Sequence, residues 1–447
     1  MHKVQGDFMK NRTKTFCSGL LIFCFAVTFP AAMELDIQKA CEIALKNNAD
    51  ILSQKINLES AKRLSNHSWN SISPSLSLAA FQNYPNDKNL NENTLTLEAK
   101  ANINFSTNLF FEIQKAKKDY EAAAINFEEM QKTIEKNVRT AYFALLYEKD
   151  KIDFLKSNLE TLKNQYEQNS EKYKSGNLSQ LDVISSRLSY EKAKPQLEEA
   201  IVANKNNLAA FMKVIGLECA EEVTISEKLE DFMSAFGIGL SNEEIQKYSQ
   251  DAFNPAENPS VKIARKNLEI AKTALYAGRM SAYTPVFSAS YAYQHEKSKE
   301  DSVSAEKKGG SLSLGVTLPL DGFLPWSKTS DGISDSKDSV KKCGIKLSEA
   351  EKSAKMDFNA SLRNLLQKKN SLTSLELGVK LAEQSYDMAL EAYKRGSKDL
   401  LSLQNASDQK LEAKNLYSAG MLAYLTECTN LEAMLGVEFG RLFKRKI

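Results

Sequence analysis

The sequence repeats itself at an offset of 210 to 220 residues, and this repeat limits the possible folds more than any other feature. One motif is Asn57-Leu58-Glu59-x-Ala61-Lys62, which recurs as Asn267-Leu268-Glu269-x-Ala271-Lys272. Another is Tyr173-Lys174-x-Gly176, which recurs as Tyr393-Lys394-x-Gly396. Such a period indicates one structural unit present twice. We expect units at 33–220 and 240–437, a linker at 221–239 and a basic tail at 438–447.

Each unit contains two segments with the alternating pattern of a β-strand. Between Thr94 and Phe105, apolar and polar residues alternate along the whole segment, which is a strong strand signal. We expect strands at 75–84 and 94–105 in the first unit, and at 286–295 and 311–320 in the second. Each has room for the ~9–11 residues of a tilted membrane-spanning strand. The alternative is an ordinary sandwich with one solvated face.

Four strands are too few to enclose a pore, because small barrels have about eight. If these strands enter a membrane, a cyclic oligomer must complete the barrel. Three copies of the chain would supply twelve strands.

Very long helices are expected after each strand pair. From residue 113 to 173, apolar residues recur at spacings of three and four, as along a coiled-coil seam. A helix of that length measures roughly 90 Å, so it forms a rod or the wall of a tunnel rather than a globular core. Gly176 and Gly396 are suited to end these helices. Ser179 and Asp182 resemble a capping box that starts a returning helix, and Pro195 should kink or break that helix.

The first 32 residues have the character of a signal peptide. Basic residues precede the apolar stretch from Phe16 to Phe29, and Pro30-Ala31-Ala32 follows it. Met1 and Met9 are both candidate start residues. Without this segment, 55 basic and 56 acidic residues remain, so no nucleic-acid partner is expected.

The remaining sequence lacks the patterns of enzymes and metal sites. It has two histidines, His67 and His295, and no phosphate-binding loop, GxSxG motif or metal-ligand spacing. Cys41, Cys219, Cys343 and Cys428 show no CxxC spacing and are interpreted as dispersed core thiols rather than disulfide partners. We therefore expect no catalytic residues, no cofactor and no metal.

The order of these elements resembles the TolC-like outer membrane efflux protein family over nearly the whole mature chain. The motifs that carry the resemblance include Leu35-x-x-x-x-Ala40-x-x-x-Ala44-Leu45-x-x-Asn48, Pro74 before the first strand, Tyr173-x-x-Gly176-x-x-x-x-Leu181-Asp182-Val183, and Leu318-Pro319-Leu320-Asp321-Gly322. A weaker second copy reads Tyr393-x-x-Gly396-x-x-x-Leu400-Leu401. The first unit departs from the family because it lacks the proline–glycine signature after its strands.

The resemblance implies a mostly α fold with a small β part. Two tandem helix–strand–strand–helix repeats would form a long coiled-coil α-barrel and contribute four strands to a shared trimeric transmembrane β-barrel. It implies a homotrimer in the lipid of the cell outer membrane, with a helical tunnel in the periplasm. A periplasmic adaptor and an inner-membrane transporter would feed it in efflux or type I secretion. The rival interpretation is a secreted periplasmic or surface coiled-coil scaffold or adhesin without channel activity.

The candidate site lies at the two hairpin tips, about 175–182 and 395–401. The residues expected in the gate and in adaptor docking are Gly176, Leu178, Asp182, Gly396, Lys398, Leu400, Ser402 and Asn405. We expect Asp182 and Lys398 to form an ion pair that keeps the tip closed, and Leu178 and Leu400 to be exposed for an adaptor. Family members can carry acidic residues where Ser402 and Asn405 stand, which argues against an aspartate ring here.

Two tryptophans flank the strand regions. Trp69 precedes the first strand and Trp326 follows the last. Tryptophan favours the boundary between lipid and water because its ring is apolar and its N–H remains hydrated. We therefore expect both at the periplasmic rim of the barrel; the alternative is that they pack at a domain joint.

Overall fold

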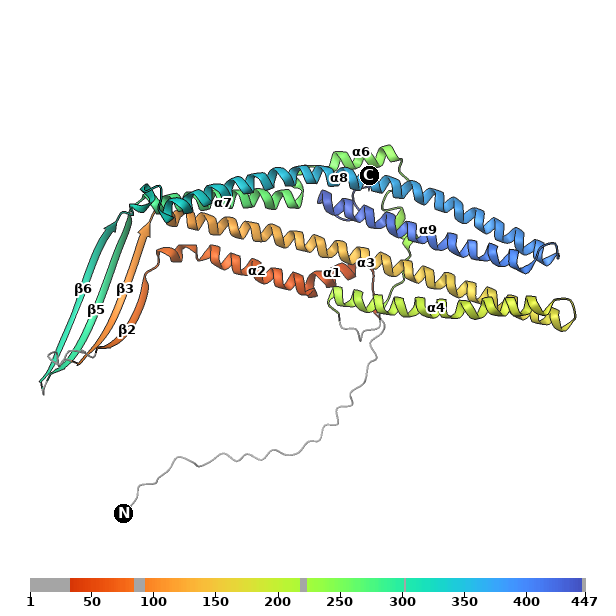
Figure 1. Cartoon of the computed structure of the whole chain (residues 1–447), viewed down its shortest axis with the longest axis horizontal. Helices are drawn as coiled ribbons and strands as arrows, with labels where there is room; N and C mark the ends of the chain where they lie inside the picture. The colour runs from red at the N-terminus through yellow and green to blue at the C-terminus, as the bar shows by residue number, and fades with distance from the viewer. Residues whose placement is uncertain (1–32, 84–92, 218–222, 301–302, 444–447) are drawn as a thin grey trace, which may run out of the picture.

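The computed structural model describes residues 33–83, 93–217, 223–300 and 303–443. The expected signal peptide, Met1, Met9 and Cys219 lie outside the described residues. The molecule is elongated, with a sheet at one end and two helical hairpin tips at the other (Figure 1). The predicted fold class, mostly α with a small β part, is confirmed.

The sheet contains β2 (Ser75–Asn83), β3 (Asn93–Ser106), β5 (Val286–Glu300) and β6 (Val303–Thr317). They are antiparallel in the order β2-β3-β5-β6. Strands β5 and β6 are longer than expected because their pairing continues into charged residues, where the apolar alternation stops. Strand β6 ends before Leu318-Pro319-Leu320, which the sequence placed inside it; Pro319 has no N–H for the ladder. A separate short parallel pair joins β1 (Met33–Glu34) to β4 (Val223–Thr224).

The helices of the two repeats match each other closely. They comprise α1 (Ile37–Asn47), α2 (Ala49–Asn66), α3 (Asn108–Lys174), α4 (Gln180–Ile215), α5 (Leu229–Met233), α6 (Asn242–Ala252), α7 (Pro259–Tyr283), α8 (Lys328–Lys394) and α9 (Leu400–Leu435), with short 3₁₀ segments η1 (Ser68–Ile72), η2 (Pro255–Glu257) and η3 (Asp321–Phe323). Helices α3 and α8 each have 67 residues, a length of about 100 Å. Helices α4 and α9 each have 36 residues.

Helix α4 runs without interruption through Pro195, so the expectation that this proline would break the helix is wrong. Pro195 is exposed, and α4 packs along α3. Water can therefore solvate the carbonyl that loses its hydrogen bond, while the packing against α3 keeps the helix continuous.

The core lies midway along the long helices, where the segment joining the repeats wraps around them. Tyr142 of α3 and Tyr424 of α9 are fully buried. The Tyr142 hydroxyl contacts the Leu35 carbonyl at 3.0 Å and the Glu227 carboxylate at 2.5 Å. The Tyr424 hydroxyl donates to the Phe236 carbonyl at 2.9 Å. The described part of the expected linker, residues 223–239, is thus packed into the core and is fixed by one tyrosine from each repeat.

The tail and the cysteines also belong to this region. The buried Glu432 carboxylate accepts hydrogen bonds from the backbone N–H groups of Gly440 and Leu442, which anchors the described part of the tail. Cys41 and Cys428 are buried free thiols, and Cys343 is partly exposed.

An asparagine at the same place in each repeat ties two helices together. The Asn48 side chain accepts from Asp50 N–H at 2.9 Å, capping α2, and donates to the Val214 carbonyl of α4 at 2.8 Å. Asn258 likewise caps α7 and donates to the Met434 carbonyl of α9 at 3.4 Å. Each buried amide therefore joins the end of a returning helix to the start of a helix that leads to the sheet.

Over the residues that the structure describes, no helix is both long and apolar enough to cross a membrane.

Candidate functional site

The two hairpin tips have the same backbone geometry. Helix α3 ends at Lys174 and α4 begins at Gln180; helix α8 ends at Lys394 and α9 begins at Leu400. Gly176 and Gly396 have φ angles of +78° and +72°, in the left-handed region that glycine adopts without steric cost. The sequence therefore placed both tips correctly, at the far end of the molecule from the sheet (Figure 1).

A serine and an aspartate cap the returning helix at each tip, but they exchange positions between the repeats. At the first tip, Ser179 is the N-cap: its Oγ accepts from Asp182 N–H at 3.2 Å and donates to the Asp182 carboxylate at 2.7 Å. At the second tip, Asp399 is the N-cap and accepts from the N–H of Ser402 at 3.1 Å and from its hydroxyl. The hydrogen bonds from Ser402 lower the pKa of Asp399. Ser402 is thus part of a helix cap, while Asn405 is exposed one turn later.

Asp182 and Lys398 line the same hollow between the tips. Within the described part of the chain, no ion pair joins them, so the expected ion pair is absent from this conformation. Asp182 instead engages Ser179 in its own tip. An exposed ion pair stabilises a protein by only ~0–1 kcal/mol, which is too little to draw Asp182 away from a local hydrogen bond.

A partly buried hydrogen bond that the sequence did not reveal connects the two repeats near the tips. The Tyr393 hydroxyl of α8 donates to the Asn169 Oδ1 of α3 at 2.8 Å. Asn169 is 1% exposed, and its Nδ2 atom has no hydrogen-bond partner. The signal in the sequence was the position of Asn169 on the apolar seam between Tyr166 and Tyr173.

The leucines beside the tip glycines point inward, so the expectation that they are exposed is wrong. Leu400 is 3% exposed and Leu178 is partly buried. Both line the hollow between the two tips. The exposed leucines are Leu181 and Leu401, at 74% and 61%, which occupy equivalent positions in the two repeats.

Two opposite edges of the helical region expose apolar rows near the tips. On α4, the exposed residues are Leu181, Ile184 and Leu188. On α8, they are Leu377, Leu381 and Met388. Spacings of three, four and seven place the α4 residues on one face of their helix. Both rows lie on outer surfaces of the single chain.

The sheet has one apolar face. Its register aligns Leu78 with Ala99, Ala99 with Tyr293, and Phe287 with Val316. Exposed residues of this face include Leu76, Leu78, Leu97, Phe105, Phe287, Tyr291, Tyr293, Leu312, Leu314 and Val316. The opposite face carries Thr96, Glu98, Lys100 and Ser313. Each outermost strand, β2 and β6, is paired on one side only among the described residues. The sheet is therefore open at both edges and exposes apolar side chains over most of one face, from the helical end to the row of Leu97.

Both tryptophans lie where the sheet meets the helices. Trp69 belongs to η1 and is 58% exposed; Trp326 precedes α8 and is 80% exposed. Neither is packed into a joint. Their predicted contact with the membrane boundary stays a prediction.

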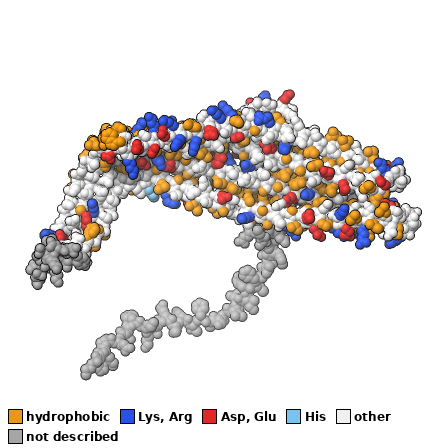
Figure 2. All heavy atoms as spheres, viewed as in Figure 1, with side chains coloured by type: hydrophobic (Ala, Val, Ile, Leu, Met, Phe, Trp, Pro, Cys, Tyr) orange, Lys and Arg blue, Asp and Glu red, His pale blue; other side chains and the backbone are white. Residues whose placement is uncertain are grey.

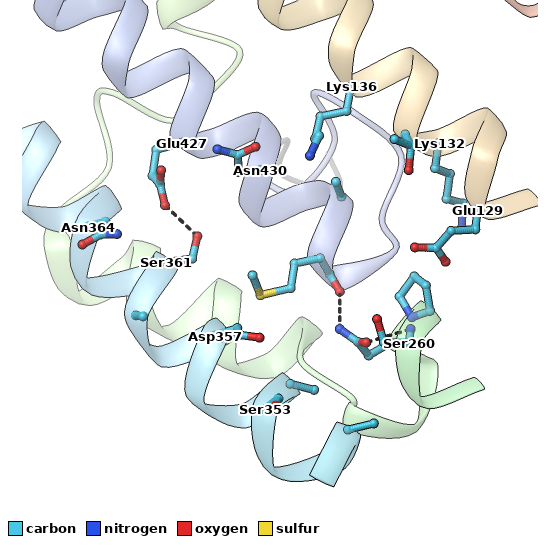
Figure 3. Close-up of a pocket in the computed structure, with 18 residues that line it drawn as sticks. Glu129, Lys132, Lys136, Ser260, Ser353, Asp357, Ser361, Asn364, Glu427 and Asn430 are labelled. Carbon is cyan, nitrogen blue, oxygen red and sulfur yellow. Dashed lines mark hydrogen bonds between the residues drawn. The ribbon is translucent and has the colours of Figure 1, made fainter. Parts of the chain in front are cut away.

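A polar hollow of about 560 Å³ lies where α9 ends and α7 begins, between α3 and α8 (Figure 3). Lys132 and Lys136 of α3 face Asp357 of α8 across it. Burial raises the pKa of Glu129, and Ser361 donates to Glu427 at 2.8 Å. In the described segments, no group of three or more histidine, cysteine or acidic side chains is arranged to hold a metal ion. The space-filling view shows acidic and basic side chains interspersed over the helices (Figure 2).

Comparisons with known proteins agree with this geometry. Residues 40–217 match the model of the outer membrane efflux protein family. No curated protein matches the chain. Among solved structures, VceC from Vibrio cholerae is similar with a TM-score of 0.69 and 14% identity, covering 90% of this chain and 96% of that one. The Campylobacter jejuni CmeC outer membrane channel is similar with a TM-score of 0.69 and 16% identity, covering 90% of this chain and 85% of that one. The open state of the Neisseria gonorrhoeae MtrE outer membrane channel is similar with a TM-score of 0.70 and 15% identity, covering 90% of this chain and 89% of that one. At these identities the likeness establishes the fold.

Proposed function

We propose, from the match of residues 40–217 to the model of the outer membrane efflux protein family, that the chain is one subunit of a channel that conducts substrates passively from the periplasm to the exterior. Proteins of this family are channels of the outer membrane rather than enzymes, in line with the absence of catalytic motifs from the sequence. The observation that carries the proposal is the open four-stranded sheet with one apolar face.

The functional unit is a homotrimer. In lipid, an unpaired strand edge costs several kcal/mol for each unsatisfied backbone group, so a spanning sheet must close. Three copies would pair β2 of one subunit with β6 of the next and make a twelve-stranded barrel. The same arrangement brings the apolar row on α4 (Leu181, Ile184, Leu188) toward the row on α8 (Leu377, Leu381, Met388) of a neighbour. Within the two rows, Leu188 and Met388 lie at similar distances from the tips, eight residues after the start of α4 and six before the end of α8.

The channel works within a tripartite efflux or type I secretion system. A periplasmic adaptor and an inner-membrane transporter deliver substrate to the helical tips. Leu401 replaces Leu178 and Leu400 as the candidate adaptor contact, because it is exposed at the start of α9 and lies outside the row on α4.

The tips act as a gate, and the hydrogen bond between Tyr393 and Asn169 holds it closed. This bond joins α3 to α8 at a partly buried position, so the two hairpins cannot separate without breaking it. A neutral hydrogen bond contributes only about 1 kcal/mol. Three copies in a trimer would give a barrier that docking of an adaptor can overcome.

The test is to reconstitute the purified protein, determine its mass in detergent by light scattering, and record conductance in planar bilayers. A trimer that conducts ions is expected, whereas a scaffold or adhesin would neither trimerise through the sheet nor conduct. Two neighbouring substitutions provide a matched control. Leu314→Arg places a charge on the apolar face and should cost ~2–4 kcal/mol at mid-membrane, abolishing insertion. Ser313→Arg changes the opposite face and should insert with altered ion selectivity. Equal insertion of both variants would contradict the orientation of the sheet.

A further inference from the structure

A cationic cluster lies on the apolar face of the sheet, at the end far from the helices. The register places Leu97, His295 and Lys308 side by side, and Leu95, Lys297 and Glu306 beside them. Directly paired residues share a face. The row that carries Phe287 and Tyr293 therefore continues into the cluster of His295, Lys297, Glu306 and Lys308.

The cluster has more positive groups than its carboxylate can satisfy. The nitrogens of His295, Lys308 and Lys297 lie 2.6, 3.4 and 3.7 Å from the same Glu306 Oε1 atom. The two lysine side chains remain 51% and 59% exposed. Exposed ion pairs of this kind are weak, so each ammonium group keeps donors free for another anion.

The position of the cluster matches the far boundary of a membrane. From Phe287 at the helical end of the sheet, His295 is eight and Lys297 ten residues away along β5. At ~3.4 Å per residue and a tilt of about 40°, they lie roughly 20 to 26 Å from Phe287 along the membrane normal. The apolar band of outer-membrane barrels is about 25 Å tall. If the chain spans the membrane as proposed above, these side chains lie at the level of the lipid headgroups in the outer leaflet.

The neighbours of the cluster are suited to a lipid rather than to a small anion. Leu95 and Leu97 are 41% and 50% exposed on the same face, next to Lys297 and His295. Tyr293, 42% exposed, continues the surface toward the middle of the membrane. Acyl chains can lie along these apolar side chains while the lysine ammonium groups reach the headgroup.

We propose that His295, Lys297 and Lys308 form a binding site for the phosphate group of a phosphorylated lipid in the outer leaflet. The inference rests on the proposed membrane channel. Glu306 holds His295, Lys297 and Lys308 together when the site is empty and competes with the phosphate for them. The site would fix the level and orientation of the barrel in the outer leaflet.

The experiment titrates the purified trimer in detergent with lipid A that carries both phosphates, and counts bound lipid by native mass spectrometry. The double variant Lys297→Gln/Lys308→Gln should bind at least tenfold more weakly. Glu306→Gln should bind severalfold more tightly, because the competing carboxylate is gone. The matched control is Lys307→Gln, which removes a lysine from the same strand on the opposite face and should change binding less than twofold.

Three results would overturn the proposal. An equal loss in Lys307→Gln would show a non-specific charge effect. Equal binding of lipid A without phosphates would exclude phosphate recognition. Full competition by inorganic phosphate at millimolar concentration would assign the site to the free anion. Conductance is recorded on the same preparations: a conducting channel with no lysine-dependent binding refutes the lipid site alone, whereas an absence of conductance refutes the channel.

Discussion

The glycines that end the two returning helices offer a matched pair of substitutions within one chain. Gly216 and Gly436 have φ angles of +77° and +70°, so alanine at either position meets the cost of the left-handed region, about 1–2 kcal/mol. Their surroundings differ. A Cβ on Gly216 would lie 2.7 Å from the backbone carbon and oxygen of Asn47, whereas a Cβ on Gly436 would meet nothing closer than 3.9 Å.

The difference in contact predicts a difference in stability. Gly436→Ala should cost about 1–2 kcal/mol, from backbone conformation alone. Gly216→Ala also has to move the end of α1, an overpacking effect of about 1–3 kcal/mol, and disturbs the nearby hydrogen bond between Asn48 and Val214. We expect a total of about 2–5 kcal/mol for Gly216→Ala.

The assay is thermal unfolding of both variants in the same detergent, followed by circular dichroism at equal trimer concentration. Gly176→Ala is the control for backbone strain in an open environment, since its φ is +78° and a Cβ there would contact nothing within 4 Å. The midpoint should fall most for Gly216→Ala. Equal unfolding temperatures for Gly216→Ala and Gly436→Ala would refute the reasoning, because they would mean that the end of α1 moves without loss of stability.

Further substitutions test the gate, the asparagine ties and a buried carboxyl group. Tyr393→Phe should raise single-channel conductance, because it removes the hydrogen bond between the repeats; unchanged conductance would exclude that bond from the gate. Asn48→Ala and Asn258→Ala should each lower stability by about 1–2 kcal/mol through loss of a helix cap, with the larger effect at Asn48, whose bond is shorter; chemical denaturation measures this. Burial raises the pKa of Asp150 to about 6, so the charged form is disfavoured in the folded protein. The loss of folding stability caused by the charged Asp150 carboxylate is absent below pH 4, grows as the pH rises to about 6 and is constant above that. Asp150→Asn should therefore stabilise the protein by roughly 1–2 kcal/mol at pH 7.5, after allowance for solvent screening, and have no such effect at pH 3.5; equal effects at both pH values would contradict this assignment.

Local patterns in the sequence identified the elements of the fold but not all of their packing. The alternation from Thr94 to Phe105 and the repeated Tyr-Lys-x-Gly motif are set by interactions between near neighbours, so they predicted a strand and both tips. Whether Leu400 is buried or exposed depends on how the two tips lie against each other. That contact joins residues brought together only by the fold, and the sequence interpretation missed it.

The candidate site likewise combines local features that the sequence predicts with long-range contacts that it does not reveal. The Asn169–Tyr393 hydrogen bond connects residues 224 positions apart, and a polar residue on an apolar seam does not reveal its partner. The absent ion pair between Asp182 and Lys398 has the opposite cause. Complementary charge suggested it, but a nearer hydroxyl group satisfies the aspartate.

The exchanged serine and aspartate at the two tips bear on how the repeats diverged after duplication of an ancestral unit. The shortest route from Ser179–Asp182 to the order of Asp399–Ser402, with two substitutions, passes through either two serines or two aspartates. Two aspartates would set like charges within hydrogen-bonding distance. Two serines keep an acceptor for the first turn of the helix and lose only charge. The exchange can therefore proceed through the serine pair, and every intermediate keeps a capped returning helix. The side chains of each tip can thus change separately while the two 67-residue helices stay the same.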